Sequence, residues 1–124
     1  MVIVDTSVWI AYLRGNKNLY SQLNRLLDED AVALAAPVWI EILSGSSKAN
    51  LQQLKRIFSA LPRFYPHEST WQTVEQWIIH SVLAGQRFSF TDLLIGAIAS
   101  EAKALIWSLD NDFARMHKLG FVSI

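Results

Sequence analysis

The chain has 124 residues, with eleven basic and eleven acidic side chains, and its length suits one compact domain over residues 1–124. A formal charge of zero argues against general electrostatic binding of nucleic acid, so the phosphates of any nucleic acid that binds would have to be held locally. No apolar run reaches the roughly eighteen residues that a membrane span needs. The absence of cysteine excludes disulfides and thiolate metal sites. A chain without disulfides suits the cytoplasm, where we expect this protein.

In the first half of the chain, short β-branched or small apolar runs alternate with helical patterns. Gly15 is expected to end the first helix, and Pro37 fits the first turn of the last one. In chain order the pattern predicts strand 2–4, helix 7–14, helix 19–27, a charged turn at 28–30, strand 31–35 and helix 38–43.

The same alternation continues in the second half. It predicts a helix over about 51–61, a weak strand 63–65, helix 68–84, helix 92–103 with Thr91 as its N-cap, strand 104–108, helix 113–118 and strand 121–124. On the long helix 68–84 we expect one side to carry Trp71, Val74, Ile78 and Val82. Strands that alternate with helices predict an α/β fold: a central parallel sheet of four to five short strands with helices on both faces.

Acidic residues follow this alternation at positions that a parallel sheet brings together. Asp5 ends the first strand, Glu41 lies in the helix after the second, Asp92 begins a helix, and Asp110 and Asp112 follow the late strand. Parallel strands all end at one edge of the sheet, which is where α/β proteins bind ligands. Carboxylates gathered there repel one another, and a divalent cation relieves that repulsion. The pattern therefore predicts a metal-dependent nuclease.

Each of these acids also has an ordinary structural explanation. Asp5 and Asp92 fit helix N-caps, and Asp110 and Asp112 fit a turn. Glu41 fits a solvated helix position, although its neighbours are apolar, and an acid in such a run is more often paired or metal-bound. No single acid decides between the two explanations.

Four segments together are more specific, and they resemble the successive motifs of the PIN-domain nucleases, most closely the VapC-type toxins of toxin–antitoxin pairs. These segments are Val4–Ile10, Trp39–Gly45, Thr91–Ala99 and Ser108–Phe113, in the order that the family has them. By this resemblance the acidic quartet of the family corresponds to Asp5, Glu41, Asp92 and Asp110, with Asp112 as an additional acid. Ser108 stands where members often have Thr, and Gly96 where Ala is common.

The resemblance implies a PIN-like fold and an endoribonuclease that depends on one or two Mg²⁺ or Mn²⁺ ions, held by those five acids. Carboxylate oxygens are the ligands that these ions prefer. Ser7 and Ser108 would orient a carboxylate or a water beside the ions. The resemblance also implies a homodimer and an antitoxin protein, whose segment would lie across an apolar groove. The chain has no basic DNA-reading helix, so DNA would be bound only through the antitoxin.

Two related alternatives stay open: a PIN-type nuclease of RNA processing, and an inert PIN-like scaffold that only binds a partner. A receiver domain fits poorly because Asp5 has no acidic neighbour, and a haloacid-dehalogenase-like phosphatase fits poorly because position 7 is serine.

The three histidines lack metal-ligand spacing. Arg14, Arg87 and Arg115 are candidates for contacts with phosphate or a partner, but we favour the interpretation as solvated charges at helix ends. We expect Trp71 or Trp77 to contact a partner chain.

Overall fold

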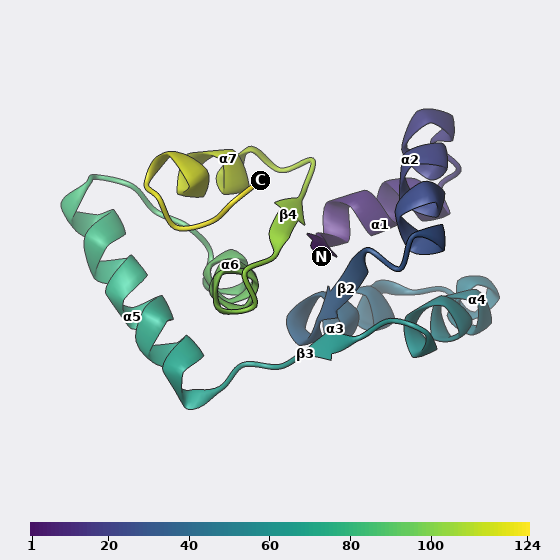
Figure 1. The fold of residues 1–124 in the computed structure, drawn as a ribbon, viewed down its shortest axis with the longest axis horizontal. Coiled ribbons are helices and arrows are strands. Elements are labelled where there is room, and N and C mark those ends of the chain that lie inside the picture. Colours follow the sequence, from purple (N-terminus) through teal and green to yellow (C-terminus); the bar gives the residue numbers. More distant parts are fainter.

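The computed structural model describes all residues, 1–124, and contains a four-stranded parallel sheet with seven helices (Figure 1). The strands lie in the order β3-β2-β1-β4. Their bounds are β1 Val2–Val4, β2 Val32–Ala35, β3 Arg63–Phe64 and β4 Leu105–Trp107. The predicted α/β class and parallel sheet are thereby confirmed.

The helices lie on both faces of the sheet. Their bounds are α1 Thr6–Leu13, α2 Lys17–Asp28, α3 Ala36–Gly45, α4 Lys48–Ser59, α5 Glu68–Leu83, α6 Phe90–Glu101 and α7 Asn111–Lys118. The first two crossovers step from β1 to β2 and on to β3, whereas the third returns past β1 to β4. Because parallel crossovers are right-handed, this reversal puts α5 and α6 on the face opposite α1 to α4. Figure 1 shows α5, α6 and α7 on one side of the strands, with α1, α2 and α4 on the other.

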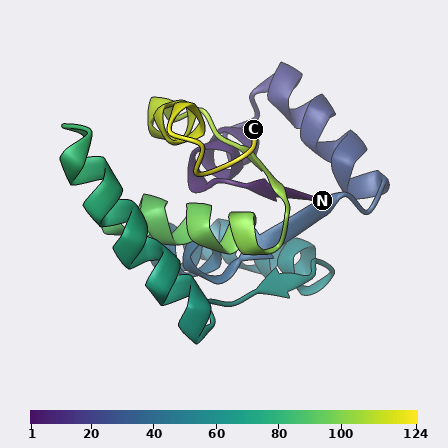
Figure 2. The same cartoon turned by 60° about the vertical axis from the view of Figure 1, so that its left-hand side comes forward.

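The core is built around β2, whose four residues are all buried, and around α6. Seven consecutive residues of α6, from Leu93 to Ala99, are buried because this helix lies against the sheet, α5 and the C-terminal segment. A Cβ atom at Gly96 would lie only 3.2 Å from Trp77 and 3.1 Å from Val122, so the small residue permits close packing there. Figure 2 shows α5 crossing α6 on the outside of the molecule.

Several predicted bounds are wrong: helices α2, α3 and α4, predicted at 19–27, 38–43 and 51–61, each differ by one to three residues at their ends. Three further differences lie in the C-terminal part of the chain. Residues 121–124 do not form a strand: Ser123 makes one isolated bridge to Leu105, because Phe121 and Val122 turn into the core after a left-handed Gly120. Helix α6 begins at Phe90, and its N-cap is Ser89, whose hydroxyl accepts a hydrogen bond from the backbone N–H of residue 92. Helix α7 begins at residue 111, two residues earlier than expected.

The side of α5 that carries Trp71, Ile78 and Val82 is not the buried one. Trp71, Ile78 and Val82 are 47%, 42% and 53% exposed, and the buried residues of this helix are Thr70, Val74 and Ser81. The helix carries apolar residues on two faces, so periodicity alone does not select between them. The hydroxyls on the inner face are satisfied locally: Ser81 donates to the carbonyl of residue 77 at 2.6 Å, and Thr70 accepts from the backbone N–H of residue 67.

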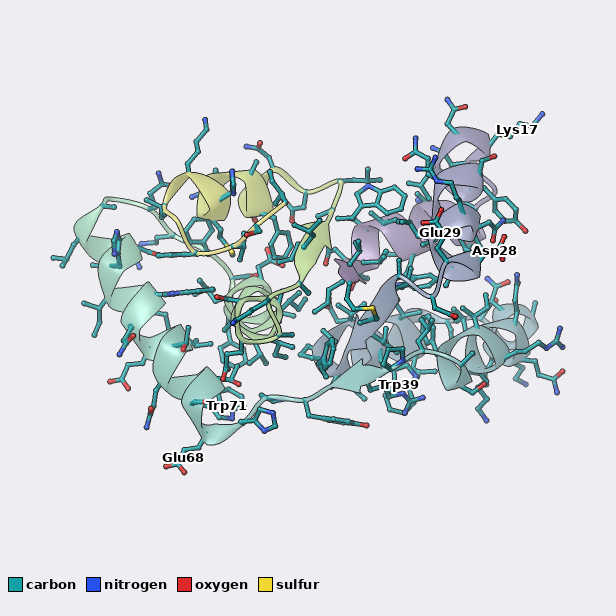
Figure 3. The ribbon with its side chains drawn as sticks, viewed as in Figure 1. Lys17, Asp28, Glu29, Trp39, Glu68 and Trp71 are labelled. Carbon is teal, nitrogen blue, oxygen red and sulfur yellow. The ribbon has the colours of Figure 1, made fainter.

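The two tryptophans of α5 have different surroundings. Trp77 stacks on Phe121 with a centroid distance of 4.5 Å, so it belongs to the packed interior. Trp71 stacks on Phe90 at 5.8 Å, and both of these rings are exposed. Figure 3 shows Trp71 near the start of α5, in the neighbourhood of Glu68. None of the seven helices has the length and apolarity that crossing a membrane requires.

Candidate functional site

The reversal of strand order between β1 and β4 marks the position where an α/β sheet forms a binding crevice, outside the carboxyl ends of the strands. Val4 and Trp107 pair as the last residues of these two strands, and the backbone N–H of Asp5 donates to the carbonyl of Trp107 at 2.9 Å. Asp5 and Ser108 are therefore the first residues beyond the sheet, side by side at the crevice.

Asp5 is buried, with 5% of its surface exposed, and its carboxylate is held by two serines. Its Oδ2 accepts hydrogen bonds from Ser7 Oγ at 2.9 Å and from Ser108 Oγ at 2.8 Å. Each serine oxygen in turn accepts a backbone N–H, from Leu109 and Asp110 respectively. The pair of serines thus ties the turn after β4 to the acid after β1, as expected of residues that orient a carboxylate.

Position alone would make Asp5 an ordinary N-cap of α1, but its side chain makes no capping hydrogen bond. The buried carboxylate is turned toward the serines rather than toward the first turn of the helix. Asp110, by contrast, does cap: its Oδ1 accepts from the backbone N–H of Asp112 at 3.0 Å and begins α7. The ordinary structural explanation therefore fails for the side chain of Asp5 and holds for Asp110.

Three acids at the starts of two helices lie close together near Asp5. One carboxylate oxygen from each acid lies within 4.8 Å of the other two. The acids are Asp92 in the first turn of α6, and Asp110 and Asp112 at the start of α7. Residues 92 and 110 are far apart in the sequence, and the fold brings them together as predicted. Asp5 and Glu41 lie outside this group of three oxygens.

The electrostatics of Asp92 reflect this crowding. Burial raises its pKa to about 6, and the negative charges of Asp110, Asp5 and Asp112 add to the rise, while a hydrogen bond with Ser89 opposes it. Burial and mutual repulsion therefore make the Asp92 carboxyl easier to protonate, and a nearby cation would oppose this effect. Divalent cations are the strongest local charges that proteins use to reverse such an effect.

Glu41 lies on the other side of Asp5, in α3. Its carboxylate accepts a hydrogen bond from Thr6 Oγ1 at 3.2 Å. Although the residue as a whole is exposed, partial burial of its carboxyl group raises its pKa; the Thr6 hydrogen bond opposes this rise and the charge of Asp5 adds to it. Asp5 is thus electrostatically coupled to both Asp92 and Glu41, and connects the acids of α3 with those of α6 and α7.

The chemistry of the group can be compared with what different metal ions need. All three converging atoms are carboxylate oxygens, with no nitrogen or sulfur among them. Hard oxygen ligands suit Mg²⁺ and Mn²⁺ rather than zinc. Of the histidines, His67 is the N-cap residue of α5, and His117 Nδ1 lies 2.9 Å from the carbonyl of Val122. The residues present therefore fit a magnesium or manganese ion.

Sequence reasoning missed one residue that contacts the group. Arg115, interpreted above as a solvated charge, forms an ion pair with Asp112, with Nη1 and Oδ1 2.7 Å apart. Its guanidinium also donates to the side chain of Gln86 and to the carbonyl of Arg87. The i, i+3 spacing of Asp112 and Arg115 on one helix could have suggested the ion pair, but no local pattern could have indicated Gln86.

Comparison with known proteins places the chain in a family. The model of the PIN domain family matches residues 2–119. VapC ribonuclease Mb1587 from Mycobacterium bovis and ribonuclease VapC11 from Mycobacterium tuberculosis are each 32% identical to the chain over 119 residues. Each match covers 91% of this chain and 89% of the relative.

Solved structures agree on the fold. The structure of VapBC2 from Rickettsia felis, bound to a DNA fragment from its promoter, has a TM-score of 0.78 at 20% identity, covering 93% of this chain and 92% of that one. VapC20 from Mycobacterium tuberculosis, a toxin that cleaves the sarcin–ricin loop, has a TM-score of 0.65 at 18% identity. The match covers 100% of this chain and 98% of VapC20. The chain therefore belongs to the PIN domain family, in the group of the VapC ribonucleases.

Proposed function

We propose that the protein is the toxin of a toxin–antitoxin pair and acts as an endoribonuclease dependent on Mg²⁺ or Mn²⁺. The observation that carries this proposal is the convergence of Asp92, Asp110 and Asp112 beside the buried Asp5, at the switch point of the sheet. The ribonuclease names of the curated relatives support the same activity. Such a toxin would act in the cytoplasm, where its RNA substrates lie.

The residues divide the work according to their surroundings. Asp92, Asp110 and Asp112 offer the converging oxygens that would hold one or two ions, and Asp5 and Glu41 extend the acidic surface. When bound, the metal would polarise the scissile phosphate and lower the pKa of a water molecule that attacks it. Ser7 and Ser108 both donate to Oδ2 of Asp5 and so hold its carboxylate in one orientation, while neither serine occupies Oδ1.

The two alternatives predict different behaviour. An inert scaffold does not need its acids, yet all five predicted acids are present here, and three of them converge. A nuclease of RNA processing would have the same chemistry but no cognate inhibitor. The curated relatives, which match over 91% of the chain, are VapC ribonucleases, and this favours the toxin.

The first experiment follows cleavage of RNA by the purified protein after EDTA washing, with Mg²⁺ or Mn²⁺ then restored. We expect cleavage only with metal, and none in an Asp5→Asn variant whose melting temperature is unchanged or higher, because its amide oxygen still accepts from both serines. Asp28→Asn is a matched control: this exposed acid ends α2, before β2 begins, at the opposite edge of the sheet (Figure 3). Full activity of Asp5→Asn would overturn the proposal.

We infer that the antitoxin lies in a groove of about 260 Å³ between α1, α3 and α4. Four of the eleven residues that line this groove are apolar, among them Ile10 and Ile42. Glu41 lies in its wall, where a basic side chain of the partner could reach the acids. An Ile10→Glu variant, altered at a 40% exposed side chain, should lose binding of the antitoxin encoded beside the toxin gene while it keeps RNA cleavage. Unchanged binding would exclude this groove.

We also infer a homodimer through the outer face of α5. Ile78, Ile79, Val82 and Leu83 are all exposed there and carry no charge, a surface that gains by burial against the same face of a second copy. Leu83 is 83% exposed, so Leu83→Glu removes little packing within one chain. Light scattering should find a dimer for the wild type and a monomer for this variant; a dimer in both would rule out this face. Operator DNA would be bound through the antitoxin.

A further inference from the structure

Asp112 is held from outside the acidic group by an arginine that has several partners of its own. Arg115 Nη1 donates to Asp112 Oδ1 at 2.7 Å. Arg115 Nε and Nη2 both donate to Gln86 Oε1, at 3.1 and 2.8 Å, and Nη2 also donates to the backbone carbonyl of Arg87 at 3.1 Å. One guanidinium therefore connects the start of α7 with the segment between α5 and α6.

An aromatic ring fixes the plane of this guanidinium. Its Cζ lies 4.3 Å from the ring centroid of Phe88, and Phe88 in turn contacts the buried Phe121 edge-on. A planar fork that stacks on a ring and donates to two groups loses little freedom when it also binds a carboxylate. This arrangement differs from a solvated helix-end charge, whose ion pair alone would contribute little.

The connected segment also leads into the helix that carries the second acid. Residues 86–88 are followed directly by Ser89, the N-cap of α6, and Asp92 lies in the first turn of that helix. Arg115 therefore fixes the position of Asp112 relative to the segment that positions Asp92. It contacts only Oδ1 of Asp112, which leaves Oδ2 free for another partner.

We propose that Arg115 and Gln86 form a positioning clamp, which holds the carboxylate of Asp112 at the distance from Asp92 and Asp110 that a single divalent cation needs. This inference rests on the proposed function, because it assigns residues to the same metal site. Arg115 is a positioning residue: it acts through Asp112. Two effects of the arginine oppose each other, since its positive charge weakens attraction of a cation and its geometry preorganises the ligands.

Binding of Mn²⁺ alone, measured by calorimetry on the RNA-free protein, separates these two effects. Arg115→Ala should weaken Mn²⁺ binding about 10- to 100-fold, the usual effect of removing a group that orients a ligand. Gln86→Ala should weaken it in the same direction by a smaller factor. Arg115→Lys keeps the charge but not the fork, so it should not restore wild-type affinity.

Arg87→Ala is the charge-matched control. Its side chain is exposed, and only its backbone carbonyl, which the substitution keeps, takes part in the clamp. If charge alone mattered, Arg87→Ala and Arg115→Ala would both tighten Mn²⁺ binding; if the clamp matters, only Arg115→Ala weakens it. Melting curves in EDTA establish whether each variant is folded. If Arg115→Ala does not fold, Mn²⁺ binding by Gln86→Ala tests the clamp instead.

The results separate this proposal from the proposed function. Tight Mn²⁺ binding by the wild type, with equal or tighter binding by Arg115→Ala and Gln86→Ala, would overturn the clamp and leave the nuclease proposal intact. Absence of Mn²⁺ binding by the wild type would overturn both. Weakened binding by the two clamp variants, with unchanged binding by Arg87→Ala, would establish Arg115 as a positioning residue.

Discussion

Asp5 and Asp92 lie at the same edge of the sheet, but their carboxylates are stabilised in different ways. Asp5 is buried and accepts hydrogen bonds from two serine hydroxyls of its own chain. Asp92 faces Asp110 and other acids, and its pKa is raised to about 6, first by burial and then by those charges. The chain thus supplies two serine donors for Asp5, whereas for Asp92 the hydrogen bond with Ser89 does not offset burial and repulsion, which a proton or an external cation would relieve. Removal of the Asp92 charge should therefore stabilise the metal-free protein, whereas removal of a serine that donates to Asp5 should destabilise it.

The largest expected effect is that of Asp92→Asn on activity. Loss of a ligand that stabilises charge in the transition state by several kcal/mol corresponds to roughly a thousand-fold slower cleavage. The metal-free protein should at the same time become more stable, because the substitution removes a charge from a repulsive group. Single-turnover cleavage and urea unfolding in EDTA measure the two effects. Cleavage within tenfold of wild type, or a clear loss of stability, would contradict this account of Asp92 and with it the contrast to the serines that hold Asp5.

Ser7→Ala should act in the opposite direction on stability. It removes one of two donors to a buried carboxylate and leaves the backbone N–H of Leu109 without its acceptor, which should cost about 1–3 kcal/mol. Cleavage should fall by roughly 10- to 100-fold, because the orientation of Asp5 is loosened. Ser21→Ala, at an exposed serine of α2, is the matched control. Equal stability of both variants would show that the serine pair is not needed to hold Asp5.

The smallest effect concerns pH. The pKa of Asp92 in the folded state, about 6, lies above its ordinary value of 3.8, so in this interval the folded protein holds a proton that the unfolded chain has released. The free energy of unfolding contributed by this group should therefore fall as the pH rises from about 4 to about 6 and stay constant above that interval. Asp92→Asn should remove this part of the slope in EDTA. Identical slopes for wild type and variant would mean that folding does not raise the pKa of Asp92.

The fold and the proximity of Asp92 to Asp110 could be predicted because their determinants are local, whereas the roles of the five acids stay a prediction. Apolar runs such as residues 32–35 and capping residues at helix starts mark the elements, and the motifs around Asp5, Asp92 and Asp110 lie directly after them. That Asp92 and Asp110 share a site follows from parallel strands ending at one edge, so the sequence order of the motifs was sufficient.

Three features could not be predicted, because they depend on tertiary packing. Helix α5 has two apolar faces, and only contact with α6 makes Trp77 the inner tryptophan and Trp71 the outer one. The C-terminal residues have strand-like composition, but Phe121 is buried in the core instead of extending the sheet. The contact of Arg115 with Gln86 joins residues 29 positions apart, which no local pattern indicates.

The most direct test of the metal site is diffraction from crystals soaked in Mn²⁺, with data collected at the manganese absorption edge. We predict an anomalous peak at about 2.0–2.2 Å from carboxylate oxygens of Asp92, Asp110 or Asp112 in the wild type, and no peak there in Asp92→Asn. A wild-type map without a peak among these oxygens, or with its only peak elsewhere on the surface, would contradict the account.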